Sequence, residues 1–326
     1  MKIDLMLLRV ATKTLQTAVA RKLISAGCNL VAPRQIPWFD RPEAEDVIGR
    51  LIARGNIDQS DAERLRQWVR EGYFVVKNPV PTHDIDAISS LIDGLPSARR
   101  PILGLRLLGI QESPHSDAID ISHREFLNRY ALEDRIRILA NSSWRIQGLH
   151  RWHRGIRQVF RNRELLRLAS LIFQHRAIAA ATLTFARGSG QSLHQDMAVF
   201  HIQPRSFLIG CWIACEDIAP DSGPLVYYPG SHRSPGFAEF DNYQTNLRTC
   251  NVSAAQRYYD WVSKESGQFE PKRFLARKGD VLFWHSMLFH GGETIQRSDA
   301  TRKSLVIHYR VRGSNRAWAV PGPFNW

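Results

Sequence analysis

Three side chains in the second half of the sequence have the types and spacing of a mononuclear metal site. His194 and Asp196 stand two residues apart, so on an extended chain both point to the same side. His290 lies far along the chain and would have to come from a neighbouring strand. Two imidazoles and one carboxylate can occupy one face of an octahedral iron ion. Three open positions would then remain, enough for a bidentate 2-oxo acid and dioxygen.

Each part of this pattern is weak by itself, because a His-x-Asp tripeptide arises readily by chance and the chain has twelve histidines. A lone histidine is more often a satisfied core or surface residue than a ligand. His285, five residues before His290, would face away on a strand, and we interpret it as structural or as a partner of the site. Phe200 and His201 follow the His-x-Asp tripeptide closely, and they could line the substrate pocket or be ordinary core residues.

The elements that must position these residues are short strands. Apolar runs broken by Gly/Pro turns cover residues 73–77, 179–186, 206–215, 224–229, 273–284 and 303–312. Such a series predicts a β-sandwich or barrel and argues against a parallel α/β sheet. The first 70 residues are helical in pattern, with a basic amphipathic helix over 5–26 and a capping box at Ser60-x-x-Glu63.

Further motifs surround the three candidate ligands in a fixed order. They are Gly188-Ser-Gly-Gln-Ser-Leu-His-Gln-Asp196, Cys211-Trp-Ile-Ala214, Asp221-Ser-Gly-Pro-Leu225, Pro229-Gly-Ser-His-Arg233, Lys278-Gly-Asp-Val-Leu-Phe-Trp-His285, His290-Gly-Gly292 and Arg302-Lys303. In these motifs the sequence resembles the phytanoyl-CoA dioxygenase family of Fe(II)/2-oxoglutarate oxygenases, over roughly residues 65–315. The resemblance implies a mainly β fold with flanking helices, built on a double-stranded β-helix (jelly-roll, cupin-like) core.

The resemblance also implies roles for six residues. His194, Asp196 and His290 would bind Fe(II), and Arg302 would form a bidentate salt bridge with the distal carboxylate of 2-oxoglutarate. Two less specific positions complete the cosubstrate pocket: an aromatic residue, Trp212, and a polar residue, Gln191.

Two positions depart from the family pattern. Arg302 follows His290 by twelve residues where the family usually has eleven, which implies a one-residue insertion and leaves Arg297 as a rival. Gly292 stands where many members have a serine that touches the cosubstrate, so one hydrogen bond would be absent.

The implied reaction is an Fe(II)- and 2-oxoglutarate-dependent oxidation that consumes O2 and releases succinate and CO2. Because Asp196 keeps the metal carboxylate that related halogenases lack, hydroxylation or another oxidation is implied in place of halogenation. The substrate class is a small or lipid-like molecule with an unactivated carbon, and desaturation or cyclisation remain open. A catalytically silent member of the fold, acting as a binding module, is the alternative.

We predict two parts in the chain: a helical N-terminal extension over 1–70 and the dioxygenase domain over 71–326. Within the domain, 145–175 reads as a helical insert, and the polar, aromatic interval 237–272 is a candidate lid over the active site. A chain of 326 residues, 44% hydrophobic and 23% charged, is an ordinary globular protein and excludes disordered, collagen-like and disulfide-scaffold classes.

The net charge of +13 is concentrated in two blocks. Residues 1–36 hold six basic side chains against one acidic, and residues 145–167 hold seven arginines against Glu164. Each block could simply be a helix face that is solvated or packed on the domain. The alternative for residues 1–36 is a peripheral contact with an anionic membrane. The alternative for residues 145–167 is binding of an anionic group of the substrate. Nucleic acid is disfavoured, because no binding motif or interleaved aromatic residues accompany the charge. Arg302 is the only basic residue we assign to chemistry.

The sequence pattern shows no targeting signal that we recognise. No apolar run approaches the roughly 20 residues that span a bilayer, and no signal peptide is recognisable, so we predict no transmembrane segment. Four cysteines form no Cys-x-x-Cys pair, which favours reduced thiols and a cytoplasmic location.

Overall fold

The computed structural model describes residues 36–113, 116–188, 190–200, 202–203, 206–240 and 246–316. The basic helix predicted over 5–26 lies outside the described residues, as do Cys28 and His201. The α-helices are α2 (Ala44–Ala53), α3 (Gln59–Glu71), α4 (Thr82–Gly94), α5 (His123–Arg129), α6 (Leu132–Asn141), α7 (Arg154–Phe160), α8 (Arg163–Phe173) and α9 (Val252–Ser266). None of the helices in these ranges is long and apolar enough to cross a membrane.

Antiparallel strands form the centre of the molecule. Eight of them make one sheet in the order β1-β10-β7-β12-β5-β4-β2-β3, and β11-β8-β9 make a second sheet. The strands are β1 (Tyr73–Val76), β2 (Arg106–Ile110), β3 (Ile119–Ser122), β4 (Arg145–Gln147), β5 (Ala177–Phe185), β6 (Ile202–Gln203), β7 (Leu208–Ala214), β8 (Leu225–Tyr227), β9 (Lys272–Phe274), β10 (Val281–His285), β11 (His290–Gly292), β12 (Ser304–Val311) and β13 (Asn315–Arg316).

Alternation along the central strands divides the interior into two cores. In β7, Ile209, Cys211 and Ile213 join the large core on the helical side, whereas Trp212 and Ala214 join a smaller core with β8 and β9. Strands β10 and β12 alternate in the same way. Because both faces are covered, apolar residues follow one another in these strands with few polar interruptions, which is why the sequence shows them as nearly continuous runs.

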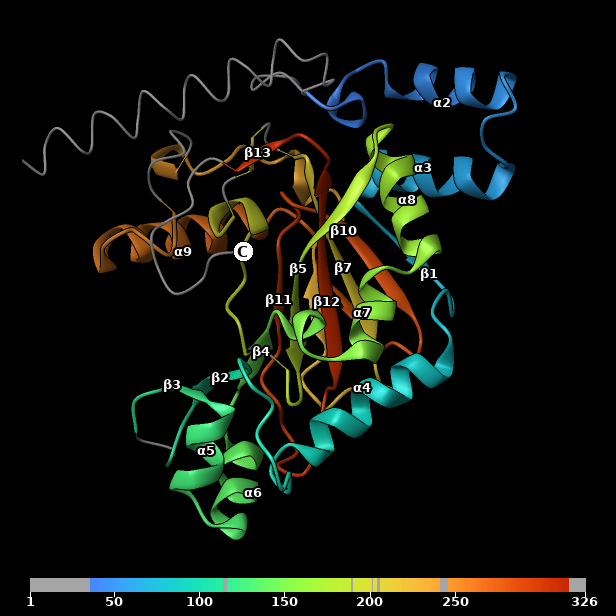
Figure 1. Cartoon of the computed structure of the whole chain (residues 1–326). Coiled ribbons are helices and arrows are strands. Elements are labelled where there is room, and N and C mark those ends of the chain that lie inside the picture. The colour runs from blue at the N-terminus through green and yellow to red at the C-terminus, as the bar shows by residue number, and fades with distance from the viewer. Residues whose placement is uncertain are drawn as a thin grey trace, which may run out of the picture.

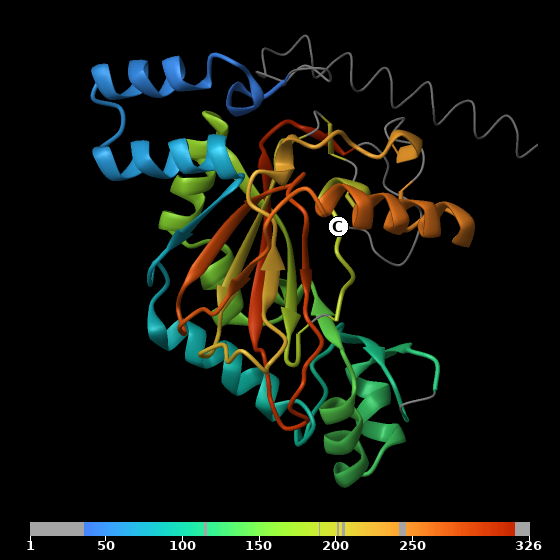
Figure 2. The same cartoon turned by 180° about the vertical axis from the view of Figure 1, so that it is seen from behind.

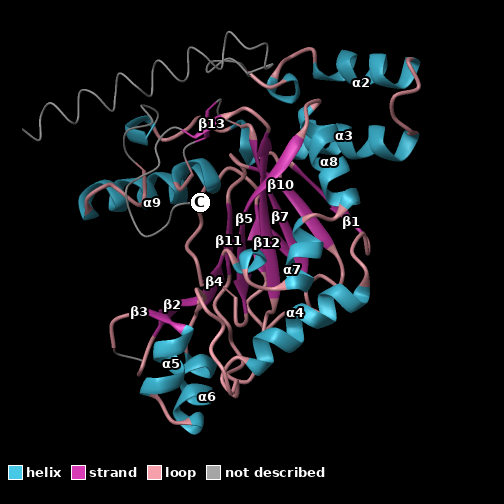
Figure 3. Ribbon diagram, viewed as in Figure 1, coloured by secondary structure: helices cyan, strands magenta, loops and turns pink. Residues whose placement is uncertain are grey.

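The helices are distributed unevenly around the sheets. Figure 1 shows α3, α4, α7 and α8 on one side of the central strands, with α9 on the other side, and Figure 2 gives the same arrangement from behind. Helices α5 and α6 lie beside β2 and β3 at one end of the molecule, as the colouring in Figure 3 makes clear. The predicted jelly-roll core with flanking helices is therefore confirmed.

Two local predictions need correction. The apolar run 273–284 is not one strand: Gly279, at a positive φ of 93°, sits in the turn that separates β9 in the small sheet from β10 in the large one. The predicted helical insert does not begin at residue 145, since Arg145–Gln147 is strand β4 and pairs with β5. Helices α7 and α8 fill most of the rest of that interval.

The interval 237–272, the candidate lid, contains helix α9. Tyr258 of α9 is fully buried, and its hydroxyl accepts a hydrogen bond from the backbone N–H of Gln195 at 2.9 Å. Phe237, Phe240 and Phe289 pack around it. This interval therefore contacts the loop that carries His194 and Asp196, while its opening and closing stay a prediction.

Candidate metal centre

Backbone pairing brings the two candidate histidine ligands together. His194 and His290 form an isolated antiparallel bridge, with reciprocal N–H to carbonyl hydrogen bonds of 2.9 and 3.0 Å. His290 begins β11, so it does come from a neighbouring strand. Asp196, in contrast, begins a 3₁₀ turn (Asp196–Ala198), so the local chain is not the regular strand that the two-residue spacing suggested.

Both imidazoles have a fixed orientation. The Nδ1 of His194 lies 2.8 Å from the carbonyl oxygen of Ser192, and the Nδ1 of His290 lies 2.9 Å from that of Leu288. A carbonyl can only accept, so each Nδ1 carries the proton and each Nε2 presents a lone pair. The amide nitrogen of Gln191 lies 3.1 Å from the Nε2 of His194, the same lone pair that a metal would use. Donation of the Nδ1–H to a backbone carbonyl, as in both of these residues, is usual for metal-binding histidines.

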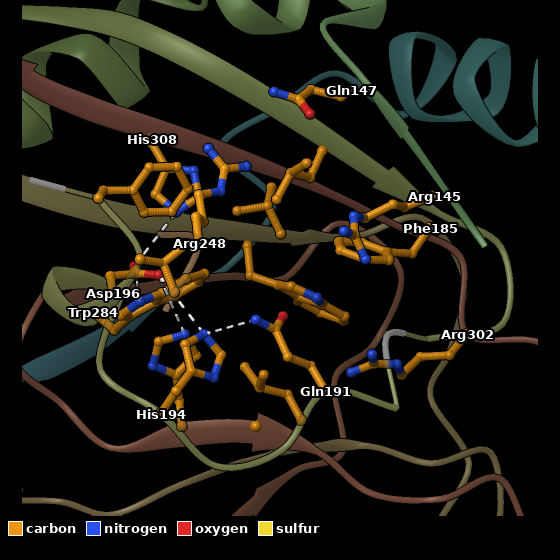
Figure 4. A pocket seen from close by; sticks show the side chains of 18 residues that line it. Arg145, Gln147, Phe185, Gln191, His194, Asp196, Arg248, Trp284, Arg302 and His308 are labelled. Carbon is orange, nitrogen blue, oxygen red and sulfur yellow. Dashed lines mark hydrogen bonds and ion pairs between the residues drawn. The ribbon is translucent and has the colours of Figure 1, made fainter. Parts of the chain in front are cut away.

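Asp196 turns one oxygen toward the histidines and one away from them. Its Oδ1 lies 3.7 Å from the Nε2 of His290 and 4.0 Å from that of His194, too far for hydrogen bonds. Its Oδ2 accepts a hydrogen bond from the indole N–H of Trp284 at 2.8 Å and lies 3.4 Å from the Nε2 of His308. One donor atom from each of the three side chains therefore lies within 4.8 Å of the others, with Oδ1 as the available oxygen of Asp196. Figure 4 shows His194 and Asp196 facing each other.

The electrostatics of the cluster suit a cation. Burial and the neighbouring His290 lower the pKa of His194 to about 4, so its imidazole is neutral at pH 7. Burial would raise the pKa of Asp196, but His308, His290 and His194 outweigh it and hold that pKa well below its usual range. A buried carboxylate with two neutral imidazoles is a donor set that fits Fe(II).

Arg302 is buried in the same pocket without the anion that a buried cation needs. Only 1% of its surface is exposed, and its Nε and Nη1 have no hydrogen-bond partner among the described residues. Burial lowers its pKa to about 10. A Cβ at Gly188 would lie 2.5 Å from the Nε of Arg302, so glycine is required there for the guanidinium to fit. These unpartnered N–H groups fit the distal carboxylate of 2-oxoglutarate.

The remaining predicted positions divide between the pocket and the surface. Trp212 and Gln191 line the pocket with the metal cluster and Arg302. Gly291 lines it as well, whereas Gly292 does not reach its lining. The rival Arg297 is 55% exposed and pairs with Asp221 and Asp299 at 3.6 and 3.1 Å, outside the pocket.

Four pocket residues have roles that sequence reasoning missed. Trp284 donates a hydrogen bond to Asp196 and His308 lies beside the same oxygen, while Arg145 and Arg248 bring two more positive charges to the lining. Arg302 is therefore not the only basic residue at the site. The sequence gives no clear signal for Arg145, because strand β4 has three residues and the prediction of a helix over 145–175 covered it.

The pocket has the lining of a small-molecule site. Its walls include the apolar side chains of Leu183, Phe185, Val199 and Leu225. A comparison with known families now bears on this geometry: residues 68–304 match the model of phytanoyl-CoA dioxygenase. The chain belongs to the phytanoyl-CoA dioxygenase family.

Relatives in this family are distant. The peroxisomal phytanoyl-CoA dioxygenase of Rattus norvegicus is 26% identical over 122 residues, which are 37% of this chain and 33% of the relative. The probable phytanoyl-CoA dioxygenase of Caenorhabditis elegans is 28% identical over 122 residues, 37% of this chain and 36% of that one. The match thus spans about a third of the length of each of these relatives.

Solved structures share the fold. SnoK, a non-heme alpha ketoglutarate dependent carbocyclase from nogalamycin biosynthesis, aligns over 82% of this chain and 90% of its own, with a TM-score of 0.56 and 15% identity. EctD from S. alaskensis, solved with 2-oxoglutarate and 5-hydroxyectoine, aligns over 78% and 76%, with a TM-score of 0.52 and 15% identity. Iron, 2-oxoglutarate and O2 are the cofactors of this family of oxygenases, and the donor set described above fits them.

Proposed function

We propose that this chain is an Fe(II)- and 2-oxoglutarate-dependent dioxygenase that hydroxylates, or otherwise oxidises, an unactivated carbon of a small-molecule substrate. One observation carries the proposal: a buried His-Asp-His cluster shares its pocket with a buried arginine whose N–H groups lack partners. In a hydroxylation, one oxygen atom of O2 enters the substrate and the other enters succinate, as 2-oxoglutarate loses CO2.

Each residue has a defined task in this proposal. His194, Asp196 and His290 hold the metal, which supplies oxygen activation when bound. Arg302 orients 2-oxoglutarate by its distal carboxylate, and Trp212 and Gln191 flank it. Trp284 and His308 keep Asp196 turned so that one oxygen faces the metal. The apolar walls exclude water from the reacting carbon.

Metal binding and succinate formation test the proposal together. The wild-type protein should bind one Fe(II), or Mn(II) as a substitute, and release succinate from 2-oxoglutarate in air, slowly without substrate and faster with it. His194→Ala should abolish both, because two remaining ligands cannot hold the ion in the pocket. His83→Ala is the matched control, since that side chain is 81% exposed and lies outside the pocket. Succinate formation that survives His194→Ala would refute the ligand assignment.

A silent binding module of the same fold gives a different result. It would show no stoichiometric metal and no succinate in any substrate screen. The buried Arg302 favours the enzyme. A buried cation without an anion destabilises the fold, and a binding module that does not bind 2-oxoglutarate would gain nothing from it. A cytoplasmic location and a role of the basic segment 1–36 at anionic lipid stay predictions.

A further inference from the structure

Arginines dominate the charged lining of the metal pocket. Among the described residues that line it, the charged side chains are Arg145, Arg248, Arg302 and a single carboxylate, Asp196. Under the proposed function, Asp196 serves the metal and Arg302 serves 2-oxoglutarate. The two charges of Fe(II) cancel those of the cosubstrate, and Arg302 cancels Asp196. Among the described lining residues, Arg145 and Arg248 then remain as two further cationic side chains.

The fold directs Arg145 into the pocket. In the short strand β4, Arg145 and Gln147 lie on one face and line the pocket, while Ile146 between them is buried in the core. Arg145 pairs directly with Phe185 of β5, and Gln147 pairs with Leu183, so the cross-strand neighbours on this face are pocket walls too. The guanidinium of Arg145 makes no hydrogen bond or ion pair with another described residue. Its charge is therefore available to a bound molecule.

Arg248 approaches from a different element, the loop before α9. Its guanidinium carbon lies 5.6 Å from the centroid of the Phe200 ring, which itself lies 4.6 Å from the ring of His308. Figure 4 shows Arg248 next to His308, and Arg302 on the far side of Gln191. Burial and the charge of Arg145 lower the pKa of Arg248, which means that the two arginines share one electrostatic environment. Two like charges from separate elements meeting at one pocket are characteristic of an anion site.

The position of Arg145 and Arg248 limits the size of a substrate that carries the anionic group. Both arginines line the same pocket as the metal ligands, so the anionic group must lie close to the carbon that is oxidised. A coenzyme A thioester carries its phosphates beyond the pantetheine chain, far from its acyl carbons. A compact acid fits better than an acyl-CoA, and planar guanidinium groups suit a carboxylate or a phosphate equally.

We infer that Arg145 and Arg248 bind an anionic group, a carboxylate or phosphate, of a compact substrate held beside the metal. This inference rests on the proposed function and names its substrate class. The arginines are specificity residues that touch the substrate, whereas Arg302 remains the cosubstrate residue. Gln147, on the same face as Arg145, supplies a further polar contact at the pocket wall.

The test uses the whole protein loaded with Mn(II) and 2-oxoglutarate, with inorganic phosphate as the probe. Calorimetry at constant ionic strength measures phosphate affinity, and enhanced relaxation of the ³¹P signal by Mn(II) shows that the phosphate binds close to the metal. We expect Arg145→Gln and Arg248→Gln each to weaken phosphate binding by about tenfold or more, since each removes a charge-assisted contact. Arg154→Gln is the control: it removes the same charge from the same arginine block, at an exposed position outside the pocket.

The outcomes separate this inference from the proposed function. Failure of the wild type to bind Mn(II) or 2-oxoglutarate would reject the function, whereas calorimetry with phosphate would still report on the arginines. The inference is overturned if the loaded wild type binds no phosphate, if the double variant keeps wild-type ³¹P relaxation, or if the variants lose 2-oxoglutarate affinity instead. Acetate and methyl phosphate, as competitors, distinguish a carboxylate from a phosphate site. If coenzyme A competes with phosphate far more strongly than methyl phosphate does, the inference that the substrate is compact is wrong.

Discussion

At the scale of single residues, the buried guanidinium of Arg302 is the most exacting feature of the site. We expect Arg302→Gln to weaken 2-oxoglutarate binding by about tenfold to hundredfold, because a bidentate charge-assisted contact is lost. Arg302→Lys should recover only part of that affinity, since one ammonium cannot reproduce the fork. Calorimetry with the Mn(II)-loaded protein measures the loss, and Mn(II) affinity itself should stay within a few-fold of wild type.

The matched control for Arg302 is Arg297→Gln. Arg297 is the rival suggested by the one-residue insertion after His290, but it pairs with Asp221 and Asp299 outside the pocket. Its variant should bind 2-oxoglutarate normally. Loss of 2-oxoglutarate binding in Arg297→Gln, with normal binding in Arg302→Gln, would reverse the assignment.

Residue types and motif order predicted which side chains gather at the site, but not what supports them. The candidate ligands His194, Asp196 and His290 could be proposed because the metal requires a small set of donor types. Trp284 and His308 could not, because their contact with Asp196 depends on how β10 and β12 pair with β7. No spacing rule along the chain encodes that register.

At the scale of elements, one glycine in β7 determines where Trp284 can lie. Gly210 pairs with Trp284 across β7 and β10, and a Cβ there would lie 1.9 Å from the Cε2 of the indole. We expect Gly210→Ala to displace the indole from Asp196 and to lower metal affinity by about tenfold to hundredfold, as loss of a partner of a metal ligand does. Metal titration followed by calorimetry measures this change.

Two further variants separate the contact from general damage to the sheet. Trp284→Phe removes the indole N–H without adding volume, so it should lower metal affinity with a smaller loss of stability than Gly210→Ala. Gly49→Ala in helix α2 has nothing within 4 Å of its new Cβ and should leave metal binding unchanged. Normal metal affinity in both Gly210→Ala and Trp284→Phe would show that the indole does not position Asp196.

Element boundaries were predictable where the apolar pattern is long and uninterrupted. The runs 179–186, 206–215 and 303–312 correspond to β5, β7 and β12 within a few residues. The run 273–284 conceals a change of sheet, because both halves are apolar and only the turn at Gly279 divides them. In the arginine block, the three residues of β4 are too few to show alternation, so the helical pattern after them dominated the interpretation.

At the scale of the whole molecule, the helices before β1 are fastened to the domain by a charged cluster. Asp61 of α3 is buried, and its carboxylate contacts Arg167 of α8 at 2.6 Å and Arg64 at 2.8 Å. On the other side, Asp40 lies 3.3 Å from the Nε2 of His285, at the end of β10. The part predicted as an extension is therefore packed against the sheet that carries the site. Sequence could not predict this, because partners such as Asp61 and Arg167 lie about a hundred residues apart.

This cluster gives the molecule a defined dependence of stability on pH. Burial alone would raise the pKa of Asp61, but Arg167 and Arg64 outweigh it and hold that pKa below its ordinary value of 3.8. A carboxyl group with a lowered pKa stabilises the fold above its unfolded pKa and loses that contribution as the pH falls through its folded pKa.

Asp61→Asn should lower the free energy of unfolding by about 1–2 kcal/mol at pH 7, a modest loss because Arg167 is 45% exposed. Urea unfolding should show a constant difference from wild type between pH 8 and about pH 5, which narrows below pH 3.8. Asp46→Asn, an exposed carboxylate of α2, should show no such difference. A loss in Asp61→Asn that persists unchanged at pH 3 would mean that packing, and not the charge of Asp61, joins α3 to α8.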